Sequence, residues 1–173
     1  MTEHGKDDIL HPDQNLVKQS ELKGAITVKL STKGRYGLRA LIDLALYGEK
    51  EAVSIQSISA RQMISDSYLE QLVRKLKKAG LVTSVRGAQG GYRLAKPAQE
   101  ISVGDVLRAL EGSIEAVSCG DENNANCLGQ DLCVARYVWE KVNKSIQETV
   151  DSIMISQLVE ESRRIQEKAG SDM

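Results

Sequence analysis

The chain of 173 residues has few aromatic side chains: no Phe, one Trp and five Tyr. This scarcity argues against modes of binding that stack single-stranded bases on aromatic rings. Only three cysteines are present, too few for the disulfide framework of a small secreted protein. No apolar run approaches the roughly 20 residues that cross a membrane, and the acidic first residues contain no apolar signal segment. We therefore expect a cytoplasmic protein with no membrane partner.

Features of common enzyme sites are missing as well. The only two histidines, His4 and His11, lie in a first segment that shows no sustained periodicity. The glycine-rich segment GAQGG lies between two predicted strands rather than before a helix, which argues against a phosphate-binding loop. We predict that the protein is not an enzyme.

Charge is unevenly distributed along the chain, although the net charge is only −1. Residues 1–27 carry three Lys and Arg against five Asp and Glu, and residues 99–173 carry seven against fourteen. Residues 28–98 carry thirteen against five, a net charge of +8. A basic block of this size attracts phosphates. On charge alone, a solvated basic face without a partner is the alternative.

The basic block has the pattern of helices joined by a tight turn. Apolar residues at helical spacing predict a helix over residues 32–48, capped by Ser31 or Thr32. A second helix is predicted over residues 55–62, and a third follows the turn QMISDS and ends at Gly80. The last two have the form of a helix-turn-helix, whose second member reads DNA.

A two-stranded ribbon is predicted directly after the third helix. Apolar residues alternate in LVTSV, GAQGG turns the chain, and YRLA returns as the second strand. A ribbon in this place is the wing of a winged helix. Its glycine-rich tip, flanked by Arg86 and Arg93, would let the backbone approach a sugar-phosphate chain. An ordinary hairpin is the alternative.

The rest of the chain is predicted to be helical around a loop. Ser102 and Asp105 resemble a capping box at the start of a short linker helix that stops at Gly112. Residues 134–154 form a long helix, and a polar helix restarts near Ser156. The long helix carries an apolar stripe of Tyr137, Val138, Val142, Ile146, Val150 and Ile153. The stripe favours pairing with a second copy, and packing against the winged helix is the alternative.

The predicted fold is therefore mainly α-helical with a small β-wing. Residues 1–27 form a flexible leader, and residues 28–98 form a winged helix-turn-helix domain that binds double-stranded DNA. Residues 99–133 contain the linker helix and a cysteine loop. Residues 134–173 contain the homodimerisation helix and the final helix.

The three cysteines, Cys119, Cys127 and Cys133, lie within fifteen residues of one another on a loop rich in Asn and Gly. Clustered thiolates suit a soft metal ion or an iron–sulfur cluster. A zinc site would usually show C-x2-C pairs and a fourth Cys or His, which are absent from this loop. Zinc and a thiol–disulfide switch remain the alternatives.

Three segments resemble the Rrf family of bacterial winged-helix regulators, its IscR branch above all: KLSTKGRYGLRALIDLAL, ISDSYLEQLVRKLKKAGLVTSVRGAQGGYRLAK, and the cysteine loop with its long helix. The resemblance covers about residues 28–160. It implies a transcriptional regulator that senses iron–sulfur cluster status and controls cluster biogenesis or related stress genes. It also implies that the three cysteines hold a 2Fe–2S or 4Fe–4S cluster. The DNA-facing residues that it implies are Ser67, Tyr68, Glu70, Arg86, Gly87, Gly90 and Gly91.

Two positions depart from the family's pattern. Where relatives carry a histidine ligand after the last cysteine, or an aspartate near the start of the first helix, this chain has Arg136 and Arg35. A guanidinium has no lone pair for a metal. The fourth ligand is therefore a carboxylate (Asp121, Glu122 or Asp131), an unmatched group, a small exogenous molecule, or absent. The alternative function is a cluster-free winged-helix regulator that uses its cysteines as a thiol or zinc sensor.

Overall fold

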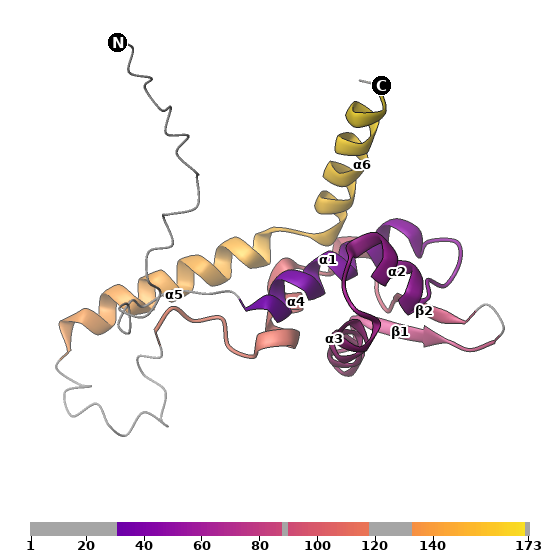
Figure 1. Cartoon of the computed structure of the whole chain (residues 1–173). Helices are drawn as coiled ribbons and strands as arrows, with labels where there is room; N and C mark the ends of the chain where they lie inside the picture. Colours follow the sequence, from indigo (N-terminus) through magenta and orange to yellow (C-terminus); the bar gives the residue numbers. More distant parts are fainter. Residues whose placement is uncertain (1–30, 88–89, 118–132, 172–173) are drawn as a thin grey trace, which may run out of the picture.

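The computed structural model describes residues 31–87, 90–117 and 133–171. Within them lie the helices α1 (Thr32–Tyr47), α2 (Ile55–Gln62), α3 (Asp66–Lys78), η1 (Ala98–Glu100), α4 (Val103–Glu111), α5 (Val134–Ser152) and α6 (Ile155–Ser171), and the strands β1 (Val82–Val85) and β2 (Gly91–Leu94). The elements are arranged as a body of α1–α4 with the β-ribbon at one edge, from which α5 and α6 extend (Figure 1). The predicted fold class, mainly helical with a small wing, is confirmed.

The helices begin where the sequence places capping residues. The Ser31 hydroxyl accepts a hydrogen bond from Lys33 N at 3.1 Å, and Ser54 Oγ accepts one from Ser57 N at the same distance. At α4, Asp105 N donates to Ser102 Oγ and Ser102 N donates to Asp105 Oδ2, both at 3.0 Å. These bonds satisfy backbone N–H groups that the first helical turn leaves unpaired, and they confirm the predicted capping box.

The core of the body forms around α1, with α4 packed directly against it. Its largest fully buried apolar side chains are Leu41, Leu44, Ile58, Leu69, Leu72, Leu76, Ile101, Val106, Leu110 and Ile155. A Cβ atom on Gly37 would lie 2.2 Å from Leu110 Cδ1, so glycine at this position allows the close approach of the two helices. The core therefore combines the helix-turn-helix with the helix that follows the wing.

The wing is an antiparallel pair in which Val82 is opposite Leu94 and Val85 is opposite Gly91. Its predicted strands are confirmed to within one residue. The segment between α1 and α2 adds an isolated bridge, in which Val53 and Tyr92 exchange hydrogen bonds of 3.0 and 2.9 Å. The wing is thereby joined to the body along its second strand.

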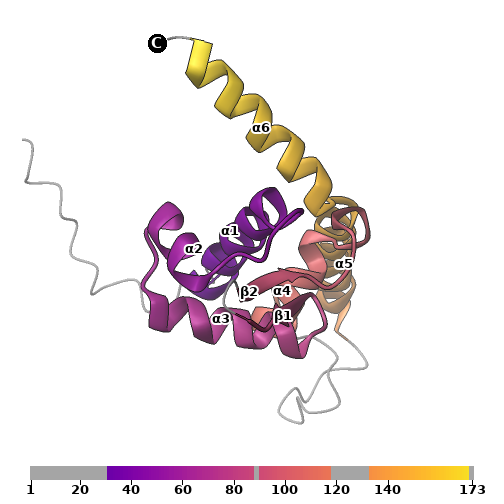
Figure 2. The same ribbon diagram turned by 90° about the vertical axis from the view of Figure 1, so that its right-hand side faces the viewer.

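The junction between α5 and α6 returns the chain to the body. Val103 N donates to Ile153 O at 2.8 Å, and Ile155 N donates to Ile101 O at 2.9 Å. These bonds end α5 two residues before the predicted end and start α6 at Ile155 rather than Ser156. Ile155 and Val159 are buried in the core, so the prediction of a merely polar final helix was wrong at its first turns. Further along α6, Arg163 Nη2 lies 3.3 Å from Glu49 Oε1, and the C-terminal part of the helix extends from the body (Figure 2).

Helix α5 differs from every other α-helix of the described residues because it buries none of its side chains. It contacts α4 near its C-terminal end, where Arg108 Nη2 lies 2.7 Å from Asp151 Oδ1. Its other end extends away from the body (Figure 1). Over the part of the chain that the structure describes, we find no helix with the length and apolar character needed to cross a membrane.

Candidate functional site

The turn between α2 and α3 is held by local hydrogen bonds. Met63 caps α2 in the left-handed conformation, with φ 55° and ψ 46°. Ser59 O accepts a bond from Ile64 N at 3.3 Å, and Ser59 Oγ donates to Ile64 O at 2.6 Å. Buried Leu69, Leu72 and Leu76 then fix one face of α3 against the core. The opposite face of α3 is presented to solvent, as a recognition helix requires.

Two of the predicted DNA-facing residues, Ser67 and Glu70, are exposed on this face. Arg74 is exposed as well and follows them at helical spacing, seven residues after Ser67 and four after Glu70. Sequence reasoning missed Arg74, although the same spacing could have identified it. The exposed face of α3 thus presents a hydroxyl and a guanidinium, which can contact base edges or phosphates, and a carboxylate, which can accept from base amino groups.

Tyr68 lies differently from its neighbours on α3. It is half-buried against the core, and its ring meets the Tyr36 ring edge-on, with centroids 6.2 Å apart and an interplanar angle of 88°. Edge-to-face packing of this kind holds the N-terminal turn of α3 to α1. The structure therefore shows Tyr68 positioning the helix, and its predicted contact with DNA stays a prediction.

The wing residues divide into exposed and supporting positions. Arg86 and Gly87 are exposed, and Gly87 has a φ of +124°, which disfavours a side chain. Gly90 N donates to Gly87 O at 3.0 Å, and residues 88–89 between them lie outside the described part. A Cβ atom on Gly91 would lie 2.5 Å from Val53 O. Gly91 therefore permits the bridge between the wing and the body.

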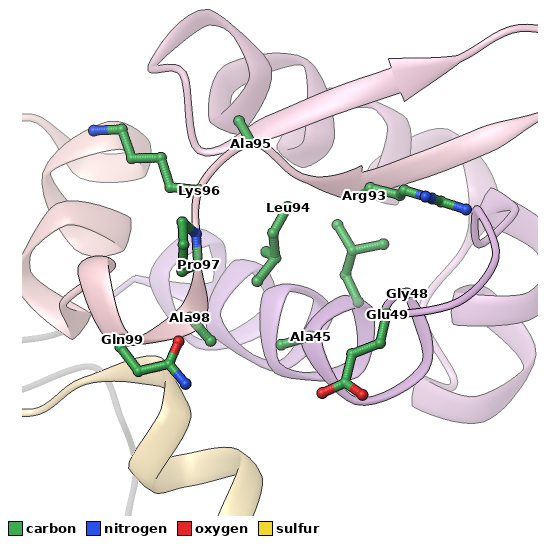
Figure 3. A pocket seen from close by; sticks show the side chains of 11 residues that line it. Ala45, Gly48, Glu49, Arg93, Leu94, Ala95, Lys96, Pro97, Ala98 and Gln99 are labelled. Carbon is green, nitrogen blue, oxygen red and sulfur yellow. The ribbon is translucent and has the colours of Figure 1, made fainter.

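Arg93, predicted to flank the wing tip, is directed to the base of the wing. Its Nη2 donates to Lys50 O at 2.7 Å, which ties β2 to the segment after α1. The side chain borders a cavity of about 420 Å³ between α1, β2 and η1 (Figure 3). In Figure 3 the Arg93 side chain extends toward the segment that begins at Gly48 and Glu49. Arg86 is consequently the arginine that remains exposed beside the tip.

Several cations of the basic block are unpaired within the described ranges. Arg74, Lys78 and Arg86 form no ion pair there, whereas Arg61 binds the buried carboxylate of Asp43. The hydrogen bond to Asp43 raises the pKa of Arg61 above its ordinary value. Arg61 therefore stabilises the body, while the unpaired cations around α3 and the wing are available to phosphates.

The cysteine segment is only partly described. Cys133 is exposed at the residue before α5, and its carbonyl accepts a bond from Arg136 N at 3.1 Å. Cys119 and Cys127 lie outside the described residues, as do the candidate ligands Asp121, Glu122 and Asp131. Within the described ranges, no group of three or more His, Cys, Asp or Glu residues could hold a metal ion. The predicted ligand set therefore stays a prediction.

The two arginines that replace family ligands have other contacts. Arg136 Nε lies 2.7 Å from Glu140 Oε1, one turn further along α5. The Arg35 guanidinium lies 5.7 Å from the centre of the Tyr36 ring. The ion pair and the cation–π contact occupy two positively charged groups, neither of which can donate electrons to a metal.

Comparisons with known proteins agree with this architecture. The model of the Rrf2 family, described as "Iron-dependent Transcriptional regulator", matches residues 30–161. The transcriptional regulator IscR of Vibrio atlanticus is 42% identical over 135 residues, which cover 78% of this chain and 77% of the relative.

Solved structures show the same relationship. The structure of IscR from T. potens is 47% identical, with a TM-score of 0.67, and the match covers 83% of this chain and 94% of that one. CymR of B. subtilis, described as a global cysteine regulator, is 37% identical, with a TM-score of 0.65 and coverage of 78% and 98%. The chain therefore belongs to the Rrf2 family of transcriptional regulators.

Proposed function

We propose that this protein is a homodimeric DNA-binding regulator that senses iron–sulfur cluster status through Cys119, Cys127 and Cys133. Its targets would be genes of cluster biogenesis or related stress responses. The observation that carries the proposal is the position of Cys133, which is exposed at the start of α5. Because α5 extends from the body and buries none of its side chains, a group bound at its start would act on the part of the chain that we assign to pairing.

The cysteine thiolates fit an iron–sulfur cluster as ligands. Thiolates are the usual ligands of iron–sulfur clusters, and Cys133 is a free thiol at the surface. When bound, the cluster would supply sensitivity to iron, oxygen and oxidation state. The protein's own contribution is to hold the two ends of the cysteine segment, which joins α4 in the body to α5 outside it. Cluster binding would then change the relative positions of two DNA-binding bodies in a dimer.

The proposed DNA contacts are those of α3 and the wing. The carboxylate of Glu70 would accept a hydrogen bond from a cytosine amino group, and Arg86 would contact phosphate or the minor groove. Ser67, Gly87 and Gly90 would lie at the same surface. The support is the exposure of all of these residues except Gly90, which is half-buried, together with the cations that form no ion pair in the described part of the basic block.

The proposed dimer forms through α5. The described body leaves two side chains of the apolar stripe uncovered, with exposed fractions of 61% at Tyr137 and 52% at Val138, and Val134, before the stripe, is 85% exposed. A second copy would cover them, and each Å² of apolar surface removed from water contributes about 25 cal/mol. Val150 and Ile153, at the other end of the stripe, pack against the body's core. Pairing is therefore expected in the first half of the helix.

The experiment that tests cluster binding is anaerobic purification of the full chain, followed by visible absorption and by iron and sulfide analysis. We expect a coloured protein that bleaches in air or with a chelator. Cys119→Ala, Cys127→Ala and Cys133→Ala should each abolish the colour and leave the helical content unchanged. If all three variants keep the iron content of the wild type, the cluster assignment is wrong.

A colourless, iron-free protein would instead support a cluster-free thiol or zinc sensor. This second candidate is favoured by the exposed thiol of Cys133 and by the similarity to CymR, whose description names cysteine regulation. Zinc analysis and the rate of thiol oxidation would then separate its two forms.

A histidine introduced at position 136 tests whether this position faces the proposed cluster. Arg136→His places a nitrogen donor one turn after Cys133, and we expect it to slow bleaching in air and shift the visible spectrum. Glu140→Gln is the matched control, because it breaks the ion pair between Arg136 and Glu140 without adding a ligand. Equal spectra and bleaching rates for Arg136→His and the wild type would show that position 136 does not face the cluster.

DNA recognition is tested with duplexes that the wild-type protein selects from a random pool. Glu70→Ala should relax discrimination at one base position by about 1–3 kcal/mol. Arg86→Ala should weaken binding to all duplexes and reduce the dependence on salt. Lys168→Ala in α6 removes one positive charge away from this surface and should change neither. Equal binding of the wild type to selected and scrambled duplexes would contradict the proposal.

A further inference from the structure

Asn143, in the middle of α5, makes an unusual pair of contacts with the chain that leads into the cysteine segment. Ala116 N donates to Asn143 Oδ1 at 2.8 Å, and Asn143 Nδ2 donates to Val117 O at 2.9 Å. One half-buried side-chain amide thus binds a donor and an acceptor of adjacent backbone residues, as a neighbouring strand would. Neither contact is local, since 26 and 27 residues separate the partners.

These contacts attach the cysteine segment to α5 at a second place. Its last cysteine, Cys133, precedes α5 directly, and Asn143 follows ten residues later, a rise of about 15 Å along the helix. Its first cysteine, Cys119, follows Val117 by two residues, which span about 7 Å at full extension. Both ends of the segment that carries the three cysteines are therefore tethered to one helix.

Attachment of α5 to the body does not depend on Asn143. The ion pair of Arg108 with Asp151 and the backbone bond from Val103 N to Ile153 O already join the two. Asn143 thus adds to an attachment that other residues also make, and it binds the chain just before the first cysteine, as a positioning residue would.

We propose that Asn143 is a positioning residue, which holds the start of the cysteine segment on the helix assigned to dimerisation. Its effect on the cluster rests on the proposed function. Because Asn143 holds the chain just before Cys119 on α5, less conformational entropy would be lost when the three thiolates come together. The same contacts transmit the state of the segment to α5.

Asn143→Ala in the full chain tests the inference, with Gln147→Ala as the matched control. Gln147 is exposed one turn further along α5. Alanine favours helix at both positions, so any loss cannot arise from unwinding of α5. The first readout is amide hydrogen exchange at Ala116, which should become about tenfold faster in Asn143→Ala only. The second is the rate at which the visible absorption of the anaerobic protein bleaches in air, which should rise several-fold in Asn143→Ala only.

The outcomes separate this inference from the proposed function. Unchanged exchange at Ala116 would show that the contact does not form, and faster exchange with unchanged bleaching would show a purely structural contact; either overturns the inference. A colourless wild type would refute the proposed cluster. The inference would then be tested by the rate at which iodoacetamide alkylates Cys119, measured by mass spectrometry. A several-fold change in that rate in Asn143→Ala, with none in Gln147→Ala, supports positioning, and equal rates overturn it.

Discussion

The body and α5 use the same sequence pattern with opposite results. Helix α1 and helix α5 both carry apolar residues at helical spacing, yet Leu41 of α1 is fully buried whereas Val138 of α5 is 52% exposed. The difference is that α1 lies among α2, α3 and α4, while α5 buries none of its side chains within the described residues. Most of the stability of a helix in a protein comes from the packing of its apolar face. The comparison shows that an apolar stripe predicts burial of one helix face but does not identify the partner that covers it.

Residues 28–98 and residues 99–173 also differ in net charge. The segment from residue 28 to residue 98 has a net charge of +8, and the acidic residues outnumber the basic ones two to one over residues 99–173. In Figure 1 the wing and the free end of α5 lie on opposite sides of the body. A DNA duplex would therefore be attracted to α3 and the wing rather than to α5, in which three Lys and Arg are matched by three Asp and Glu.

Removal of a core side chain from the body should give the largest effect on folding. Leu41→Ala leaves a cavity at the centre of α1, and we expect it to lower the free energy of unfolding by about 2–5 kcal/mol. Ile165→Ala removes a similar side chain from α6. Because Ile165 is 58% exposed, this variant should change the free energy of unfolding little. Urea unfolding followed by circular dichroism measures both, and equal losses would refute the distinction between covered and uncovered stripes.

A charge in the uncovered stripe should affect assembly rather than folding. Val138→Glu places a carboxylate in the proposed dimer interface, and we expect dimerisation to weaken about 100-fold or more because the charge would be desolvated there. Val138 is largely exposed in the single chain, so the melting of the body should change little. Sedimentation across a range of concentrations measures the mass. A wild-type mass near the 19.0 kDa of one chain at micromolar concentration would contradict the proposed dimer.

Close packing of α1 against α4 makes the body sensitive to small additions. Gly37→Ala should lower the free energy of unfolding by about 1–2 kcal/mol, because the overpacking against Leu110 exceeds the gain in helix propensity. Gly170→Ala is the matched control in α6, where an added Cβ would meet nothing within 4 Å. That variant should be neutral or slightly stabilising. A stabilised Gly37→Ala would show that α4 can shift away from α1.

Local features of the fold were predictable from the sequence because their partners are close in the chain. The start of α2 after Ser54 and the capping box of Ser102 and Asp105 depend on residues three positions apart. The wing also follows from local alternation and a glycine-rich turn, and the predicted limits of its strands are accurate to one residue. These parts of the candidate site, including the exposed face of α3, needed no knowledge of distant contacts.

Features that depend on packing between distant segments could not be predicted in this way. Asp43 lies on the buried face of α1, where Arg61 donates to it through Nε at 2.9 Å and Nη2 at 2.7 Å. The burial of Ile155 and the contacts of Asn143 likewise require the observed return of the chain to the body. In each case the sequence shows a residue type that is unexpected or unremarkable at its position, and only the tertiary structure supplies its partner.

The smallest expected effect concerns Asp105, which stabilises the start of α4 and contacts the arginine that also binds α5. Partial burial opposes ionisation of this carboxyl, but its hydrogen bonds with Ser102 and with Arg108 outweigh burial and lower its pKa below 3.8. Its stabilising contribution is therefore complete above pH 3.8, the ordinary value, and is lost as the pH falls through the lower value in the folded protein. Asp105→Asn should cost about 0.3–1 kcal/mol at pH 7. The difference between variant and wild type should persist at pH 5 and shrink below about pH 4. Urea unfolding at pH 7, 5 and 3 measures it, and a difference that grew as the pH fell would show that Asp105 is not the group stabilised at this junction.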